Sequence, residues 1–222
     1  MGIYKYDVYR SPNIGLFVKS NDTLLSVPFG FAETKVNKLK AYLEVETVLY
    51  VSVSGTRLLG PLTVMNNNGI LLPSTASEEE LQQFKDASNL NVERLDSKYT
   101  AIGNLISTND KGAAISSLIN SETFQQIKDV LGVEVRKLSI AGFVQTGSMV
   151  VATNQGAGVH PNASDEEIQE LSELLKVDVE PATVNGGIPY LSSGIAANST
   201  SMIVGTLTTG PELIILSRAF KI

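Results

Sequence analysis

Four oxygen-bearing side chains stand together in the stretch "ISTNDKG" near the middle of the chain. Ser107, Thr108, Asn109 and Asp110 have the kind of oxygen atoms that a calcium site on a tight loop would use. The same stretch also fits the tip of a β-hairpin, because Asn and Asp tolerate the left-handed backbone conformation and Gly112 adopts it without steric cost. A calcium site has no need to recur along a chain, whereas a structural turn does. Recurrence therefore distinguishes the two interpretations.

Residues suited to covalent or cofactor chemistry are scarce. The sequence has no Cys, which excludes a thiol nucleophile, a zinc-thiolate site and disulfide bonds. Its single His, His160, lies at the expected end of a strand, where a structural role is favoured. The "GAG" segment at 156–158 is a fragment of a phosphate-loop pattern, but it falls on an expected hairpin rather than between a strand and a helix. We therefore expect no catalytic residue and no nucleotide cofactor.

The composition indicates which partners the protein can bind and in which compartment it is expected. The net charge is −6 and the sequence pI is near 4.9, which argues against a dedicated nucleic-acid binder but leaves room for a strongly basic partner. No apolar run approaches about 18 residues, and the first residues, "MGIYKYDVYR", lack the apolar core of a signal peptide. We expect a cytoplasmic protein that does not bind membranes.

The stretch that opened the question belongs to a repeat. Segments similar to "IGNLISTNDKG" recur as "IGLFVKSNDT", "LGPLTVMNNNG" and "TGSMVVATNQG", with a weaker copy in "LSSGIAANST". One residue in each copy serves as an anchor: Gly15, Gly60, Gly103, Gly147 and Ser192. The anchors are separated by 45, 43, 44 and 45 residues, so the chain contains five copies of one unit.

Residues at fixed distances past the anchors support this register and distinguish the hairpin from the calcium site. The residues six past the anchors are Asn21, Asn66, Asn109, Thr153 and Asn198, and Gly stands nine past in three units. An Asn-rich turn that ends in Gly, between two apolar runs, is typical of a hairpin. Because the turn recurs in every unit, the sequence favours a hairpin over a calcium site.

Each unit also carries a helix pattern. Residues 21, 24 and 28 past each anchor form an apolar stripe, from which only Ser88 departs. Capping boxes are expected at Ser77 with Glu80 and at Ser164 with Glu167, and Pro211 fits the first turn of the last helix.

A further strand is expected to begin about 30 residues past each anchor, except in the fifth unit, which has no strand after its helix. Residues 3–10 alternate like a strand and have no helix before them, so they complete the fifth unit and close a ring. The sequence thus predicts one domain, 1–222, an α/β propeller of five ββαβ units with fivefold pseudo-symmetry. The approximate units are 14–58, 59–101, 102–145, 146–190, and 191–222 together with 1–13.

A ring of five ββαβ units resembles the pentein fold, and the whole chain resembles the archaeal branch of the initiation factor 6 family. The stretches that carry this resemblance are "IGNLISTNDKGAAIS", "NNNGILLPSTASEEEL", "NQGAGVHPNASDEEIQEL" and "TTGPELIIL". The resemblance implies a monomeric protein that binds the inter-subunit face of the large ribosomal subunit, blocks joining to the small subunit and takes part in large-subunit maturation. It implies no nucleotide and no metal.

Two other functions are compatible with a fold of this kind. Other penteins are guanidino-group hydrolases and transferases that use a Cys nucleophile, which this sequence lacks. A homo-oligomeric scaffold that uses the same surface stays open.

The loops that run into the anchors should emerge on one rim of the ring, which makes that rim the expected ribosome-binding site. Its candidate residues are Gly15, Arg57, Gly60 and Asn104. Asn104 matches the "GN" motif of the family, although a loop Asn can also satisfy its own turn. Arg57 is more similar to an Arg of the eukaryotic branch than to the archaeal pattern.

Overall fold

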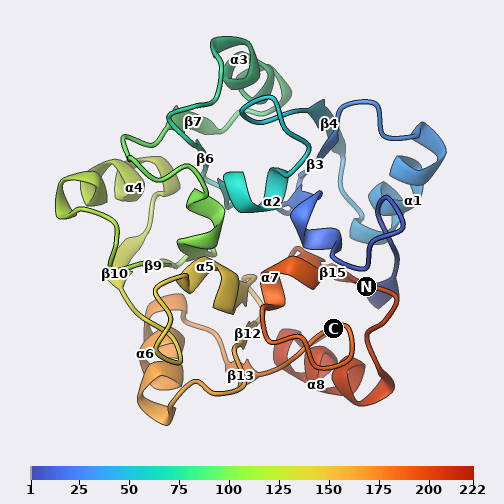
Figure 1. Ribbon diagram of the computed structural model, residues 1–222, viewed down its shortest axis with the longest axis vertical. Helices are drawn as coiled ribbons and strands as arrows, with labels where there is room; N and C mark the ends of the chain where they lie inside the picture. The colour runs from blue at the N-terminus through green and yellow to red at the C-terminus, as the bar shows by residue number, and fades with distance from the viewer. Residues whose placement is uncertain (1) are drawn as a thin grey trace.

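Each repeat forms a three-stranded sheet with a long helix on its outer side, and five such units surround a central axis (Figure 1). A computed structural model describes residues 2–222. The long helices lie at the periphery and the short helices α2, α5 and α7 lie around the centre. The predicted α/β propeller of five repeated units is confirmed.

Within a unit the order is short helix, inner strand, middle strand, long helix and outer strand. The first unit contains η1 (Ile14–Leu16), β2 (Lys19–Ser20), β3 (Leu24–Pro28), α1 (Glu33–Leu43) and β4 (Thr47–Val51). The second contains α2 (Leu59–Leu62), β5 (Val64–Met65), β6 (Gly69–Leu72), α3 (Glu78–Ala87) and β7 (Asn91–Arg94). The third contains η2 (Ile102–Asn104), β8 (Ile106–Thr108), β9 (Gly112–Ile115), η3 (Ser121–Thr123), α4 (Phe124–Leu131) and β10 (Glu134–Lys137).

The last two units follow the same order. The fourth contains α5 (Thr146–Met149), β11 (Val150–Ala152), β12 (Ala157–Val159), α6 (Asp165–Leu175) and β13 (Val179–Pro181). The fifth contains α7 (Leu191–Gly194), β14 (Ile195–Ala197), β15 (Ser201–Val204) and α8 (Gly210–Phe220), with β1 (Gly2–Lys5) as its outer strand.

The sheets confirm the hairpin interpretation. In the third unit β8 pairs antiparallel with β9, with Ile106 opposite Ile115, and β9 pairs parallel with β10. The side-chain oxygen of Asn109 accepts the backbone N–H groups of Lys111 and Gly112 at 2.9 and 3.1 Å. Asn109 therefore closes its own turn, which is the local role that favours Asn at such positions.

The N-terminal strand closes the ring as predicted, but it is shorter than residues 3–10. Strand β1 pairs parallel with β15, from Gly2 opposite Ser201 to Lys5 opposite Val204. Beyond it, Tyr9 and Arg10 adopt φ values of 54° and 61° in a turn. A strand cannot continue through positive φ angles, so the ladder ends before this turn.

The predicted helix stripes and caps are also present. Both predicted capping boxes form, and Thr209 with Glu212 forms a third. Ser88, the one residue that breaks the apolar stripe, lies just past the end of α3 in an extended conformation with φ −141°.

The apolar interior consists of five clusters, each shared by two consecutive units. In one of them Leu49 and Val51 of β4 pack with Leu81 and Phe84 of α3. In the cluster that spans the closure, Ile203 of β15 packs with residues of the first unit. Because each unit completes the core of its neighbour, the arrangement favours one cooperative folding unit over five separate domains.

Candidate functional site

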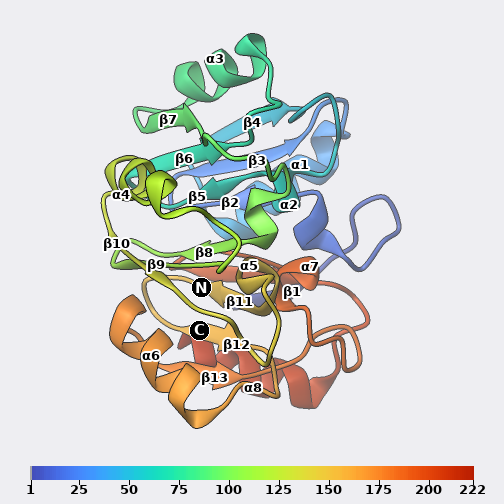
Figure 2. The same cartoon turned by 60° about the vertical axis from the view of Figure 1, so that its left-hand side comes forward.

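The two ends of the central channel differ because of the strand topology. Inner strands start at the anchors and run to the hairpin turns, and the middle strands return antiparallel to them. All five hairpin turns therefore lie at one end and all five anchors at the other. Figure 2 shows the short helices α2 and α7 toward one side of the molecule and the long helices α4 and α6 toward the other.

We call the anchor end the anchor face. It comprises the loops that lead into the anchors and the loops that follow the middle strands. The first set is 6–13, 52–58, 95–101, 138–145 and 182–190, and the second is 29–32, 73–77, 116–120, 160–164 and 205–209.

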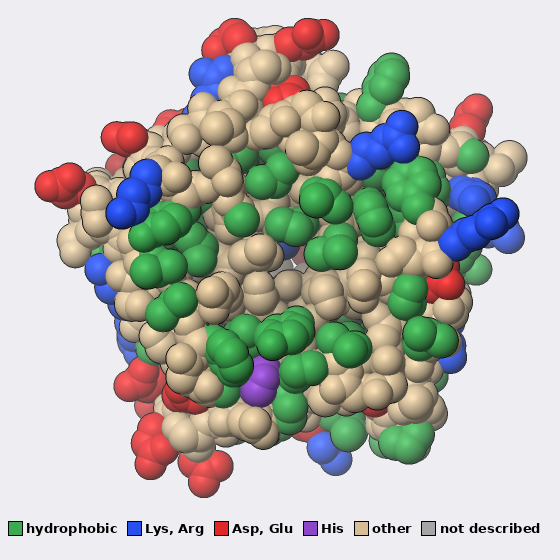
Figure 3. Space-filling view, in the orientation of Figure 1, with side chains coloured by type: hydrophobic (Ala, Val, Ile, Leu, Met, Phe, Trp, Pro, Cys, Tyr) green, Lys and Arg blue, Asp and Glu red, His purple; other side chains and the backbone are tan. Residues whose placement is uncertain are grey.

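Exposed hydrophobic side chains gather on the anchor face. Nine large hydrophobic residues are exposed in the described chain, and eight of them lie in these loops: Tyr9, Phe29, Leu58, Leu118, Phe143, Ile188, Tyr190 and Leu207. The ninth, Ile214, lies on α8. Figure 3 shows hydrophobic side chains around the central opening and most charged side chains at the perimeter. An apolar centre with charge at the rim is the composition of a protein-binding surface.

One part of this face is an aromatic cluster around the single His. The ring of His160 lies 5.5 Å from that of Phe143 and 6.4 Å from that of Tyr190. His160 is buried, and its Nδ1 accepts the backbone N–H of Asn162 at 3.1 Å. Burial lowers the pKa of His160, and the carboxylate of Glu167 partly offsets that effect. The ring is therefore neutral at pH 7 and acts as a packing element that supports two exposed aromatic side chains.

Arg57, a predicted site residue, is exposed on the loop that leads into α2. Its guanidinium carbon lies 5.5 Å from the centre of the Tyr9 ring, which is a cation–π contact between consecutive units. The loop itself is held by Glu80, whose carboxylate accepts the N–H groups of Ser54 and Gly55 at 2.8 and 2.9 Å. Arg57 therefore lies on a loop whose backbone is held in place by hydrogen bonds to Glu80.

Glu80 can brace the loop because its carboxylate stays ionised. Burial by itself would raise its pKa, but hydrogen bonds from Gly55, Ser77, Ser52 and Ser54 outweigh that effect and lower the pKa.

Asn104, the second predicted contact residue, lies at the end of η2 and borders the channel. It is half-buried rather than fully exposed. Within residues 2–222 its side-chain amide makes no hydrogen bond, so it does not satisfy its own turn. The amide therefore keeps its full capacity to donate and accept.

Gly15 and Gly60 have a different role from Arg57 and Asn104. A β-carbon on Gly15 would overlap the carbonyl oxygen of Ser192, and a β-carbon on Gly60 would overlap that of Gly15. Gly15 is buried and Gly60 is half-buried. Both glycines permit close backbone approach between units, so they shape the anchor face without presenting a side chain to it.

The opposite end of the channel is a polar ring that was not predicted from the sequence. It is formed by the residues seven past each anchor: Asp22, Asn67, Asp110, Asn154 and Ser199. The amide nitrogen of Asn67 donates to Asp22 at 2.6 Å and to Asp110 at 2.7 Å. Both carboxylates are occupied by these hydrogen bonds. Within the described residues, no group of three or more His, Cys, Asp or Glu side chains could hold a metal ion. The sequence does contain a pattern that could have predicted this ring, because a polar residue stands seven positions past every anchor.

Comparison with known proteins places the chain beside one family. The sequence pattern described as "eIF-6 family" matches residues 3–219. The chain is 50% identical over 220 residues to translation initiation factor 6 of Cenarchaeum symbiosum (strain A), and 52% identical over 220 residues to that of Nitrosopumilus maritimus (strain SCM1). Each alignment covers 99% of both chains.

A more distant relative shows the same extent of similarity. Translation initiation factor 6 of Pyrococcus horikoshii is 41% identical over 224 residues, which covers 99% of this chain and 98% of the relative. The helices described here are also all too short or too polar to cross a bilayer.

Proposed function

Because the chain belongs to the eIF-6 family along nearly its whole length, we propose that it binds the large ribosomal subunit and sterically prevents joining to the small subunit. Its relatives carry the name translation initiation factor, and a role in translation follows from membership. Subunit joining occurs in the cytoplasm, and a protein bound before joining is also in position to act in large-subunit maturation.

The observation that carries this proposal is the gathering of exposed hydrophobic side chains on the anchor face. A standard interface buries about 800 Å² on each partner. That is under a tenth of the total accessible surface of 9226 Å², so the central part of one face is sufficient. A rigid ring that covers such an area on the inter-subunit face would occupy the space that the small subunit needs.

The charge of the protein indicates the chemistry of its partner. With a net charge of −6, the protein as a whole is repelled by RNA phosphates and attracted by basic ribosomal proteins. We therefore propose that a basic ribosomal protein supplies most of the contact.

Within the anchor face, binding energy is expected to be concentrated in a few central residues. Arg57 and Asn104 supply polar contacts, and Phe143 and Tyr190 supply apolar area. Gly15 and Gly60 act indirectly, by allowing the units to approach closely enough to form the face.

The proposal includes the absence of guanidino-group hydrolysis. That chemistry in related folds uses a thiol to form a covalent intermediate, and this sequence has no Cys. We expect no turnover of arginine, agmatine or methylated arginines, and detectable turnover that is lost in His160→Ala would contradict the proposal.

Co-sedimentation with purified subunits tests the function directly. The protein should sediment with the large subunit and not with the small one, and an excess should reduce the amount of joined ribosome in a gradient. Joining that is unaffected by excess protein would refute the proposal. The mass of the free protein distinguishes the alternative, because a scaffold that pairs through the anchor face would be an oligomer rather than a monomer.

A further inference from the structure

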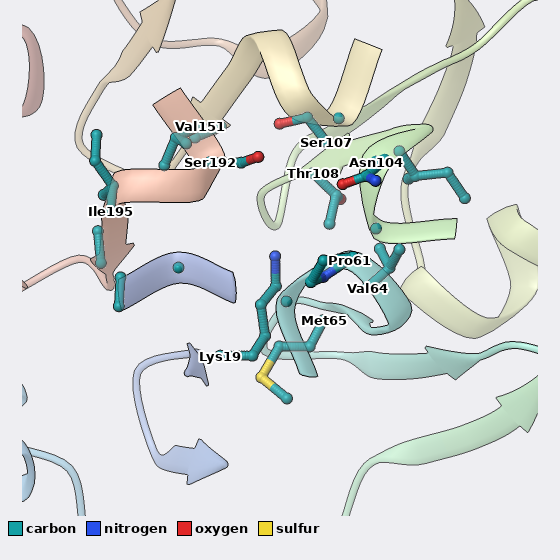
Figure 4. Close-up of a pocket in the computed structure, with 18 of the residues that line it drawn as sticks. Lys19, Pro61, Val64, Met65, Asn104, Ser107, Thr108, Val151, Ser192 and Ile195 are labelled. Atoms are coloured by element: carbon teal, nitrogen blue, oxygen red, sulfur yellow. The ribbon is translucent and has the colours of Figure 1, made fainter. Parts of the chain in front are cut away.

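The central channel contains an isolated positive charge. Lys19 extends from the inner strand β2 into the space that Asn104, Ser107 and Ser192 also border (Figure 4). Among the described residues that line this anchor-side part of the channel, Lys19 is the only one with a charged side chain. Its ammonium group makes no hydrogen bond and no ion pair with any residue in 2–222.

Lys19 is half-buried, and a charge that is partly removed from water is normally paired. Burial lowers the pKa of Lys19 to about 8, so the side chain is still mostly protonated at pH 7. No described carboxylate lines the part of the channel around Lys19, and those of Asp22 and Asp110 at its hairpin end make hydrogen bonds within the polar ring. Direct contact with this ammonium group is therefore left to water or to a mobile anion.

The neighbouring groups are suited to an anion. The side chains of Asn104, Ser107 and Ser192 make no hydrogen bond to the described residues, and each can donate one. Thr108, which also lines the channel, is different: its hydroxyl already contacts the carbonyl oxygens of Asn109 and Gly112. The free groups are therefore an ammonium, two hydroxyls and an amide, without a carboxylate that a metal would prefer.

We propose that the channel binds a small inorganic oxyanion, of which phosphate is the representative, on Lys19 with Asn104, Ser107 and Ser192 as additional donors. The channel encloses about 70 Å³. One water needs about 10–15 Å³ on this measure, so the space holds several waters or one small oxyanion. It has no room for a nucleoside. The inference does not depend on ribosome binding.

Titration of the intact protein with inorganic phosphate, at constant ionic strength in potassium chloride, tests this site. Saturable binding is expected by calorimetry or by phosphorus NMR, and sulfate should compete whereas AMP should not. Lys19→Met should weaken binding by at least about tenfold, the effect of losing a hydrogen bond to a charged group. Lys85→Met is the matched control, because it removes the same charge from the exposed surface of α3 and should bind phosphate like the parent.

A second readout reports on the lysine itself. Bound phosphate should raise the pKa of Lys19, which can be followed through its side-chain nitrogen resonance. Should Lys19→Met fail to fold, Ser107→Ala combined with Ser192→Ala should weaken binding in a folded protein.

Three outcomes would overturn the site. The first is a parent protein without saturable binding above the chloride background. The second is unchanged binding in folded Lys19→Met, or in the double Ser variant if that is the one that folds. The third is competition by AMP as strong as that by sulfate, because it would show binding outside the channel.

Discussion

The carbonyl oxygen of Gly15 lies where a β-carbon on Gly60 would have to be. The relationship repeats around the axis, since Gly103 meets Gly60 and Gly147 meets Gly103 in the same way. These anchors are thus the points where consecutive units touch near the channel. Glycine is required there because of the approach between backbones, not because of the turn conformation alone.

This relationship predicts that Gly60→Ala destabilises the ring. The added methyl group would have to displace the backbone of the preceding unit, and overpacking of this kind typically lowers the free energy of unfolding by about 1–3 kcal/mol. Urea unfolding followed by circular dichroism measures the change. Gly210→Ala is the control, because nothing lies within 4 Å of a β-carbon there, and its stability should stay near that of the parent. Equal effects of the two variants would contradict the packing argument.

Removal of residues 1–5 tests the closure of the ring. Without β1, the backbone groups of β15 lose their parallel partner and become an open sheet edge. Several kcal/mol of stability should be lost, a large part of the 5–15 kcal/mol of a typical domain. A deletion variant as stable as the parent would show that β1 contributes nothing to closure.

The repeat explains why so much of the fold could be predicted. Comparison of the five copies predicted the hairpin at Asn109, the apolar stripes of the helices and the missing outer strand of the fifth unit, which β1 supplies. The first unit departs from the repeat at the turn glycine, and the structure differs at that place too. Leu24 stands where three units have Gly, and a groove opens there beside Ser88, where α3 has already ended. A β-carbon therefore fits at this position.

Features that depend on contacts between units were not accessible from the sequence. The ring through Asn67 and the cation–π pair of Arg57 with Tyr9 join residues far apart in sequence. The apolar anchor face was missed because its side chains stand singly in separate loops. Only the three-dimensional structure brings them onto one surface.

Glu212 should make stability depend on pH in the acid range. Burial by itself would raise its pKa, but hydrogen bonds from Thr209, Gly187 and Thr183 outweigh it and lower the pKa to about 2. A lowered folded-state pKa stabilises the protein fully above the unfolded value of 4.5, and this contribution disappears as the pH falls toward 2. Its size is up to about 3 kcal/mol, from about 1.4 kcal/mol per pKa unit.

The variant Glu212→Gln should therefore lose stability at pH 7 and show a flatter profile between pH 4.5 and 2. Thermal unfolding across this pH range gives the comparison. Glu170→Gln removes an exposed carboxylate from α6 and should leave the profile as in the parent. A parent-like profile in Glu212→Gln would show that the hydrogen bonds of this carboxylate contribute little.

The lowered pKa of Lys19 should destabilise the folded protein at neutral pH, whereas that of Glu212 stabilises it. The folded-state pKa of Lys19, about 8, lies below the ordinary 10.5, so the charged form opposes folding. This penalty is fully present below pH 8 and vanishes as the pH rises through 10.5. In phosphate-free buffer, Lys19→Met should be more stable than the parent at pH 7, by up to about 3 kcal/mol, and the difference should close by pH 10.5. A less stable variant at pH 7 would mean that packing by the lysine stem outweighs the charge.

Asn104→Arg tests whether the anchor face carries the proposed ribosome contact. The residue is half-buried at the mouth of the channel and its amide makes no hydrogen bond to the described residues, so an arginine can extend outward without breaking internal contacts. Bulk and charge placed in the apolar centre of an interface should weaken binding to the large subunit by about 2 kcal/mol or more, roughly thirtyfold. Gln155→Arg is the matched control, because it adds the same charge at an exposed hairpin turn on the opposite end of the channel. Gradient assays of subunit joining, with folding checked by thermal unfolding, should show lost activity in the first variant and retained activity in the second. Full activity in a folded Asn104→Arg would remove Asn104 from the site, whereas lost activity in Gln155→Arg alone would move the contact to the hairpin end.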